Sequence, residues 1–193
     1  MIDPDAQEVL ARLMAERAQP KRAQRPLPGW ARVALRVMPK VLLFVSLSNL
    51  LIGALAIVAP LLRVALGTAA TNWIYSAYSL ICPQRPSHTT FLAGEPMAME
   101  QRMVAMYVAF GVAGLLYLWW TALRRVLPTW AMLLGVAPAL VDVALSSAGV
   151  RPSTADSRLW TGTLASAAIV WWAYPRFDAK LRAVRTRTSP PLM

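Results

Sequence analysis

Long apolar runs with almost no charge dominate the chain and are separated by short charged stretches; Asp142, within 129–148, is the one charge inside the four runs named below. A run of about 18 or more apolar residues can cross the roughly 30 Å hydrocarbon core of a bilayer. Four runs stand out, at residues 41–62, 103–123, 129–148 and 159–174. The last is the shortest, but Arg stems at both ends can extend to the lipid headgroups. The pattern predicts an all-α integral membrane protein with four transmembrane helices.

The segment 64–84, between the first two spans, also lacks charge. It contains more Thr, Ser, Asn and Gln than is usual for a membrane-spanning helix. Lys and Arg accumulate in cytoplasmic loops. With four spans and a cytoplasmic N-terminus, 15 of the 20 Lys and Arg residues lie inside. A fifth span would move Arg124, Arg125 and the basic C-terminal tail to the opposite side of the membrane from this arrangement. We therefore predict an N-in/C-in topology in which 64–84 is a re-entrant or outer-leaflet helix packed on the bundle.

Composition agrees with a membrane protein and divides the chain into three regions. The 193 residues are 57% hydrophobic and 15% charged, whereas soluble domains carry about 25% charged residues. We expect a cytoplasmic amphipathic and basic region at 1–40, a membrane domain at 41–175 with an outer polar segment at 64–102, and a basic cytoplasmic tail at 176–193. The expected location is the cytoplasmic membrane, with several passes.

The formal charge of +11 does not indicate nucleic-acid binding. The basic residues flank the membrane spans, where anionic lipid headgroups attract them, and no nucleic-acid-binding motif accompanies them. Membrane lipids are therefore the expected partners of these residues, together with other integral membrane proteins.

The candidate site residues are polar and gather on the predicted outer side: Cys82, Gln84, Arg85, His88, Arg102, Asp142, Arg151, Asp156 and Arg158. An intramembrane carboxylate such as Asp142 is costly and by default suggests function. A structural pair with Arg102, Arg151 or Arg158 would satisfy it. Contact with a lipid or ligand headgroup, and proton transfer, remain open as alternatives. The cluster is therefore predicted to be structural or ligand-binding rather than catalytic.

Several short motifs of this outer region follow one another in a fixed order. Residues 82–94 begin Cys-Pro-Gln-Arg-Pro and end in Gly; Pro138 and Asp142 lie in a later helix; and 151–158 reads Arg-Pro-Ser-Thr-Ala-Asp-Ser-Arg before Thr161-Gly162. In order and spacing they resemble the signatures of the domain of unknown function 2085 family, a group of small prokaryotic membrane proteins. The resemblance covers about residues 72–175. It implies a membrane protein whose activity is unassigned.

The chain departs from the family pattern at the positions suited to metal or redox chemistry. The family's Cys, His, Cys, Cys set suggests a zinc or iron site, because thiolate and imidazole are the ligands such metals need. Here the His position is Pro83 and the two later Cys positions are Glu100 and Met103. Only Cys82 remains, with His88 as a weak substitute. We expect no metal site, and the cofactor is unknown, with a bound lipid as one candidate.

Small residues recur along two spans, with Ala105, Ala109 and Ala113 in one and Gly162 and Ala165 in another. Small side chains let helices approach closely in lipid. The stripes predict either close packing within the bundle or a docking face for another membrane protein.

Two hypotheses of function follow. No nucleophile–base pair, phosphate-binding glycine loop or haem ligand pair occurs in the sequence, so an enzyme is the less expected class. The first hypothesis is a non-catalytic accessory subunit of a larger membrane complex, of the respiratory or photosynthetic type as examples. The alternative is a membrane enzyme or a protein that binds a lipid or small ligand in an outer polar pocket.

Overall fold

The computed structural model describes residues 8–9, 12, 14, 29–120 and 124–186, and this part of the chain is mostly helical. The helices are α2 (Gly29–Leu66), α3 (Thr68–Ser79), α4 (Gln101–Trp119), α5 (Thr129–Ser147) and α6 (Ala155–Thr186). A short 3₁₀ turn (Pro86–His88) and a hairpin of β1 (Phe91–Leu92) and β2 (Glu95–Pro96) connect α3 to α4. Most of the predicted N-terminal region, and the end of the tail from residue 187, lie outside the described residues.

Three of the described helices are long and apolar enough to cross a membrane, namely α2, α4 and α5. Helix α2 contains the whole of the first predicted span, and α4 and α5 contain most of the second and third, since α4 ends at Trp119 and α5 at Ser147. The fourth predicted span lies within α6, which carries charge at both ends. Both α2 and α6 continue beyond the apolar runs into basic sequence. Helix α2 thus includes residues 29–40, which we predicted to belong to a separate cytoplasmic region.

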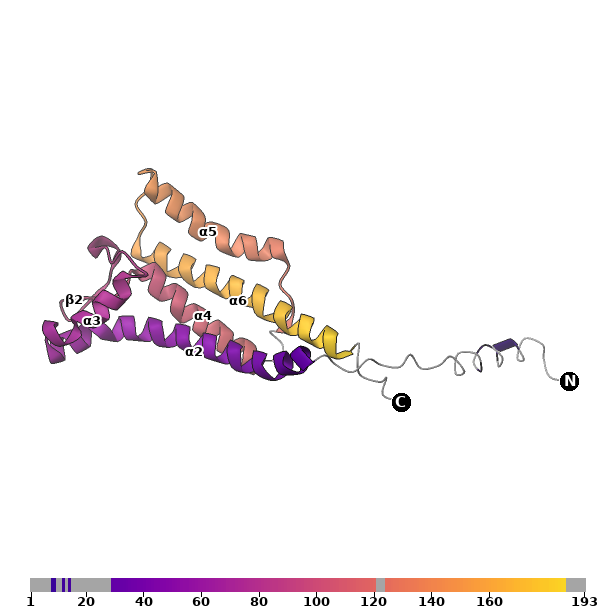
Figure 1. The fold of residues 1–193 in the computed structure, drawn as a ribbon. Coiled ribbons are helices and arrows are strands. Elements are labelled where there is room, and N and C mark those ends of the chain that lie inside the picture. The colour runs from indigo at the N-terminus through magenta and orange to yellow at the C-terminus, as the bar shows by residue number, and fades with distance from the viewer. Residues whose placement is uncertain (1–7, 10–11, 13, 15–28, 121–123, 187–193) are drawn as a thin grey trace.

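The helices run alternately up and down, and their ends gather in two groups (Figure 1). The start of α2, the end of α4, the start of α5 and the end of α6 lie together. The opposite end holds α3, the hairpin and the α5–α6 connection. We call the first group the terminal end and the second the loop end. Helix α4 packs between α2 and α6, while α5 lies along α6.

Glycines allow the central helices to approach closely. A Cβ on Gly111 would lie 2.7 Å from the Leu50 backbone nitrogen in α2. A Cβ on Gly114 would lie 2.1 Å from Ser46 Oγ, and one on Gly162 in α6 would lie 2.8 Å from the Arg102 carbonyl oxygen in α4. Contacts under 3.0 Å force the structure to shift. These small residues therefore serve packing within the bundle, one of the two uses that the sequence left open.

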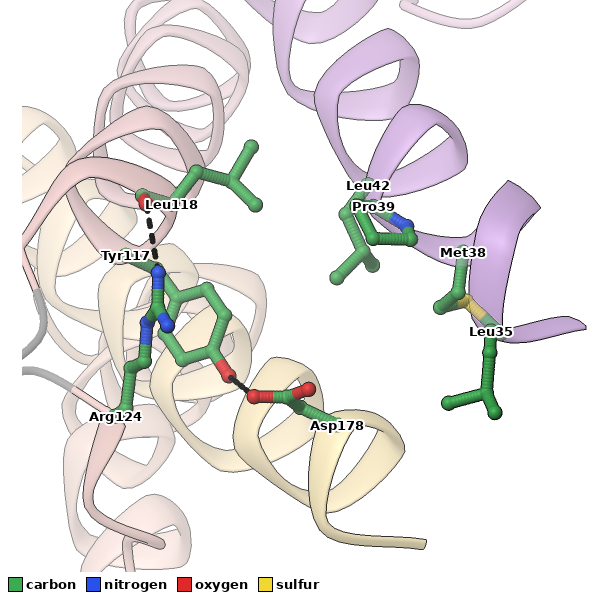
Figure 2. A pocket seen from close by; sticks show the side chains of 8 residues that line it. All are labelled: Leu35, Met38, Pro39, Leu42, Tyr117, Leu118, Arg124 and Asp178. Carbon is green, nitrogen blue, oxygen red and sulfur yellow. Dashed lines mark hydrogen bonds between the residues drawn. The ribbon is translucent and has the colours of Figure 1, made fainter. Parts of the chain in front are cut away.

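The terminal end is closed by aromatic and hydroxyl side chains. Tyr174 of α6 packs edge-on against Phe110 and Tyr117 of α4, with ring centroids 6.1 and 5.6 Å apart. Its hydroxyl shares a 3.0 Å hydrogen bond with Ser46 Oγ of α2, which also donates to the Leu42 carbonyl. A cavity of about 130 Å³ opens beside this cluster, and Tyr117 donates there to Asp178 at 3.3 Å (Figure 2). Three helices are thus joined by neutral groups and one carboxylate.

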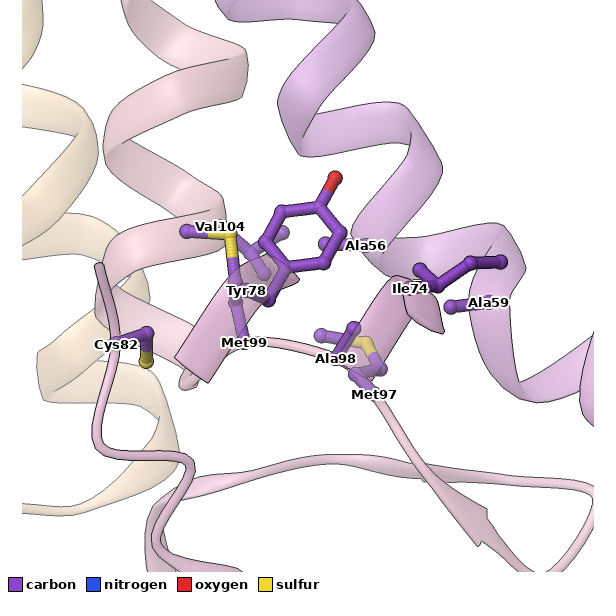
Figure 3. Close-up of a cluster of buried hydrophobic side chains, with 9 residues drawn as sticks. All are labelled: Ala56, Ala59, Ile74, Tyr78, Cys82, Met97, Ala98, Met99 and Val104. Atoms are coloured by element: carbon purple, nitrogen blue, oxygen red, sulfur yellow. The ribbon is translucent and has the colours of Figure 1, made fainter. Parts of the chain in front are cut away.

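The loop end has its own hydrophobic core, in which α3 and the segment before α4 cover the end of α2 (Figure 3). Ala56, Ala98 and Met99 are fully buried there. The Ala98 amide donates to the Ala56 carbonyl at 3.2 Å. Tyr78 of α3 donates to the Ile52 carbonyl of α2 at 2.5 Å. At 12 residues, α3 is about 18 Å long at the usual 1.5 Å rise per residue, too short to cross a membrane.

A two-residue turn closes the hairpin that follows α3. Leu92 pairs with Glu95 across the turn. Ala93 and Gly94 both have positive φ, at 53° and 84°, the backbone pattern of a type I′ turn. The hairpin leads Met97–Met99 into the core and fixes the start of α4.

Candidate functional site

An ion pair joins α4 to α5 at the loop end. The Arg102 guanidinium contacts the Asp142 carboxylate and donates to the Ala139 carbonyl at 3.2 Å. Ser153, just before α6, lies beside both and donates to Asp142 at 2.5 Å. The two charged side chains are 14% and 13% exposed. Of the three arginines considered as partners of Asp142, Arg102 is the one that pairs with it.

A reciprocal cap begins α6 and places the next polar groups. The Thr154 amide donates to Ser157 Oγ at 3.0 Å, and the Ser157 amide donates to Thr154 Oγ1 at 3.2 Å. This is the hydrogen-bond pattern of a capping box, with Ser157 in the place of the usual Glu. Because the first turn is fixed in this way, Arg158 is directed toward the α3–α4 connection, where it meets the Ser87 carbonyl.

Arg158 is the most deeply buried charged side chain of this end, with 7% of the residue exposed. Its terminal nitrogens donate to the Ser87 carbonyl at 3.1 Å, the Gln101 side-chain oxygen at 3.2 Å and the Ser153 carbonyl at 2.6 Å. All three acceptors are neutral. Within the described part of the chain no carboxylate pairs with Arg158, and its buried Nε has no hydrogen-bond partner. A buried cation usually has an anionic partner.

Glu100 organises the neighbouring loop. Its carboxylate accepts the Arg85 amide at 3.3 Å and lies 3.5 Å from His88 Nδ1. The Glu100 amide itself donates to the buried Cys82 Sγ at 3.3 Å. The two residues considered as weak metal candidates, Cys82 and His88, therefore both touch Glu100. Among the described residues, no group of three or more His, Cys, Asp and Glu side chains is placed to hold a metal.

Gln84 fixes the loop on the other side. It adopts a φ of 53°, which is uncommon for a residue other than glycine. Its amide nitrogen donates to the Tyr75 carbonyl at 2.8 Å and the Ala98 carbonyl at 2.9 Å. The Tyr75 hydroxyl donates to the Pro96 carbonyl at 2.7 Å. Burial raises the pKa of Tyr75, with Arg63 opposing the shift, so this phenol stays a neutral donor.

These contacts surround a polar cleft of about 220 Å³ at the loop end. We call it the loop-end cleft. The α3–α4 connection, α4, α5 and the start of α6 all line it, through Pro83, Arg85, His88, Glu100, Arg102, Met103, Val143, Ser146, Ser147, Ser153 and Arg158. The Arg85 side chain is 63% exposed. Three guanidinium groups thus face two carboxylates, those of Glu100 and Asp142, so one positive charge is left unneutralised.

The structure brings most of the predicted cluster together. Arg85, His88, Arg102 and Arg158 line the cleft; Asp142 pairs with Arg102, while Cys82 and Gln84 support its loop. Arg151 and Asp156 are exposed and lie outside the lining. Asp156 lies two positions before Arg158 in α6, and residues two apart do not share a helix face.

Sequence reasoning missed several groups that complete the cleft. Ser87 and Gln101 accept from Arg158, and Ser146 and Ser147 line the wall on α5. A backbone carbonyl such as that of Ser87 leaves no signal in a sequence. Gln101 lies between Arg102 and Glu100, which stands at one of the family's Cys positions, and that place in the sequence was the available signal.

The long apolar helices and the polar site between their ends define an α-helical membrane protein. Residues 82–172 match the family described as predicted membrane protein (DUF2085). The match contains the α3–α4 connection, α4, α5 and the first half of α6, and it confirms the resemblance seen in the motifs.

A protein of the archaeon Methanocaldococcus jannaschii, named only as uncharacterized, is 28% identical over 148 residues. The alignment covers 72% of this chain and 94% of that protein. No solved structure matches the chain.

Proposed function

We propose that the chain is a four-span protein of the cytoplasmic membrane with both termini inside. The loop end is then the outer end. Supporting this arrangement, the start of α2 and the end of α6 lie at the same end of the bundle (Figure 1), and the basic N- and C-terminal segments adjoin it. Helix α6, packed against α4 and α5, supplies the fourth span, with its charge-free part between Arg158 and Arg176.

Within this arrangement, the function that the geometry supports best is binding of an anionic ligand in the loop-end cleft. The observation that carries the proposal is Arg158, a buried guanidinium with neutral acceptors only and an unpartnered Nε. An anion in the cleft supplies the missing countercharge. Hydrogen bonds to an ionised acceptor are about twice as strong as neutral ones. No catalytic step is assigned, and the protein acts as a binding protein.

Thermal unfolding of the purified protein in an uncharged detergent tests this proposal. We expect sulfate, phosphate or carboxylate anions to raise the unfolding temperature in a saturable way at constant ionic strength, because a ligand that binds the native state stabilises it. Arg158→Gln removes the countercharge and is expected to abolish the effect.

Two further variants keep the test informative. Arg85→Gln removes an exposed cation from the cleft and is expected to weaken the anion effect without disturbing the fold. Arg151→Gln removes the same charge from the same end but outside the cleft, so its response should equal that of the parent protein. Equal responses in all three variants would contradict a site in the cleft and leave only general screening of charge.

A second candidate is the accessory subunit of a larger membrane complex. The observation that favours it is α5, which packs on α6 and leaves most of its surface uncovered. Leu133, Leu134 and Leu140 are between 58% and 65% exposed. In a membrane this face meets either lipid or a neighbouring protein.

Native purification separates these two candidates. The protein is extracted from its own membranes in mild detergent, the particle is weighed and its components are identified. Stoichiometric membrane-protein partners would support the subunit role. A particle that holds this chain alone would exclude a stable complex and leave ligand binding as the function.

A further inference from the structure

The shape and position of the loop-end cleft narrow the class of anion, provided that the proposed anion binding is correct. Its volume of about 220 Å³ is below the roughly 300–1,000 Å³ of sites that enclose drug-sized ligands. It therefore holds a small charged group and leaves anything larger outside. The ligand that fits is one with a compact anionic head.

The donors in the cleft match the tetrahedral oxygens of a phosphate. Arg158 offers its unpartnered Nε. Arg85 offers a guanidinium that is 63% exposed and whose Nε lies 3.9 Å from the Glu100 carboxylate. Ser146 and Ser147 add hydroxyl groups from the end of α5. Guanidinium groups recognise phosphate through parallel hydrogen bonds. A carboxylate has only two oxygens and would leave part of this set unused.

The wall of the cleft on the bundle side is apolar. Met103 of α4 and Val143 of α5 line it, beside the charged groups. Leu140 lies three residues before Val143 on the same face of α5 and is 65% exposed, so the apolar surface continues toward the middle of the helix. In the described residues α4 and α5 are joined at this point through Arg102, which bonds Asp142 and Ala139. A hydrocarbon chain that lies along this flank remains in the membrane while its head enters the cleft.

We propose that the loop-end cleft binds a phosphate group carried by a membrane lipid, with Arg158 and Arg85 as the phosphate ligands. Ser146 and Ser147 complete the contact, and the lipid chain lies along the α4–α5 flank beside Met103 and Val143. Free phosphate shares the same head chemistry and is the competing source.

Native mass spectrometry of the delipidated, full-length protein in neutral detergent tests this assignment. The probes are lysophosphatidic acid, a monoacylglycerol with the same chain, and inorganic phosphate. We expect one lysophosphatidic acid per protein, binding at least about tenfold more tightly than either other probe. Arg85→Gln and Arg158→Lys should each weaken that binding by about tenfold or more, whereas Arg151→Gln should leave it unchanged.

Each other result overturns a defined part of the proposal. Equal binding of inorganic phosphate and lysophosphatidic acid would make free phosphate the ligand. Equal binding of the monoacylglycerol would show that the chain alone is recognised. Binding of sulfate or carboxylates without either phosphate probe would refute the phosphate assignment and leave anion binding intact. If no anion binds at all, the proposed function itself fails.

Discussion

The helices are joined by different kinds of groups at the two ends of the bundle. At the terminal end, Tyr174, Ser46 and Gly114 join three helices through ring edges, hydroxyl groups and close backbone contact. At the loop end, charged groups such as Arg102 and Asp142 connect the helices. In the described residues, the two buried side-chain nitrogens without a hydrogen-bond partner belong to Arg63 and Arg158, both at the loop end.

This difference indicates which end of the bundle has groups available to bind a ligand. The hydroxyl pair at the terminal end is satisfied by its neighbours, so that region is accounted for by packing. The loop end retains a buried cation, Arg158, whose Nε has no hydrogen-bond partner and whose other nitrogens meet neutral acceptors only. Buried polar groups in native proteins are nearly always bonded. The exception therefore marks the loop end as the place for a ligand.

The largest effect that tests this comparison is expected from Asp142→Ala. The change leaves Arg102 without its countercharge, and breaking a buried ion pair costs about 3–5 kcal/mol. We expect a loss near the lower limit, about 3 kcal/mol, because both side chains keep some exposure. Unfolding in mild detergent, followed by tryptophan fluorescence, measures it. Asp156→Ala is the matched control, since Asp156 is exposed at the same end, and equal losses in the two variants would refute the role of the pair.

A smaller effect is expected at the terminal end from Gly114→Ala. The added Cβ would lie 2.1 Å from Ser46 Oγ, and overpacking of this kind costs about 1–3 kcal/mol. Gly29→Ala serves as the control because a Cβ there meets nothing within 4 Å. The same unfolding assay applies. A Gly114→Ala protein as stable as Gly29→Ala would contradict close α2–α4 packing.

The smallest effects are expected from removing single tyrosine hydroxyls. Tyr174→Phe leaves Ser46 bonded to the Leu42 carbonyl, so the loss should be about 0.5 kcal/mol. Tyr75→Phe at the loop end takes the donor from the Pro96 carbonyl, and about 1 kcal/mol is expected. Chemical unfolding of both variants side by side gives the order, and the reverse order would mean that the terminal end is the more dependent on polar contacts.

The sequence predicted where the helices lie but not where they end. Runs with almost no charge mark 103–123 and 129–148 because the bilayer excludes charge, and α4 and α5 follow them closely. Mean hydropathy does not show whether the backbone stays helical beyond an apolar run. The continuity of α2 from Gly29 into the first span and the extension of α6 to Thr186 were therefore missed.

The sequence identified the charged residues of the candidate site. It did not show which of them pair with one another. Asp142 and Arg102 stand out because a charge in an apolar helix needs a partner. Choosing Arg102 over Arg151 depends on how α4 and α5 face one another, which one sequence does not reveal. The partners of Arg158 were also hidden, because the Ser87 and Ser153 groups that it contacts are backbone carbonyls.

The central claim, that Arg158 holds an anion in the loop-end cleft, is tested most directly by NMR of the arginine Nε–H groups. Protein labelled with ¹⁵N-arginine is titrated with lysophosphatidic acid in neutral detergent, and the Arg158 signal is assigned by its loss in Arg158→Lys. We predict that this signal shifts in a saturable way while the Arg151 signal stays fixed. An Arg158 signal that remains unchanged while lipid is bound would contradict the claim.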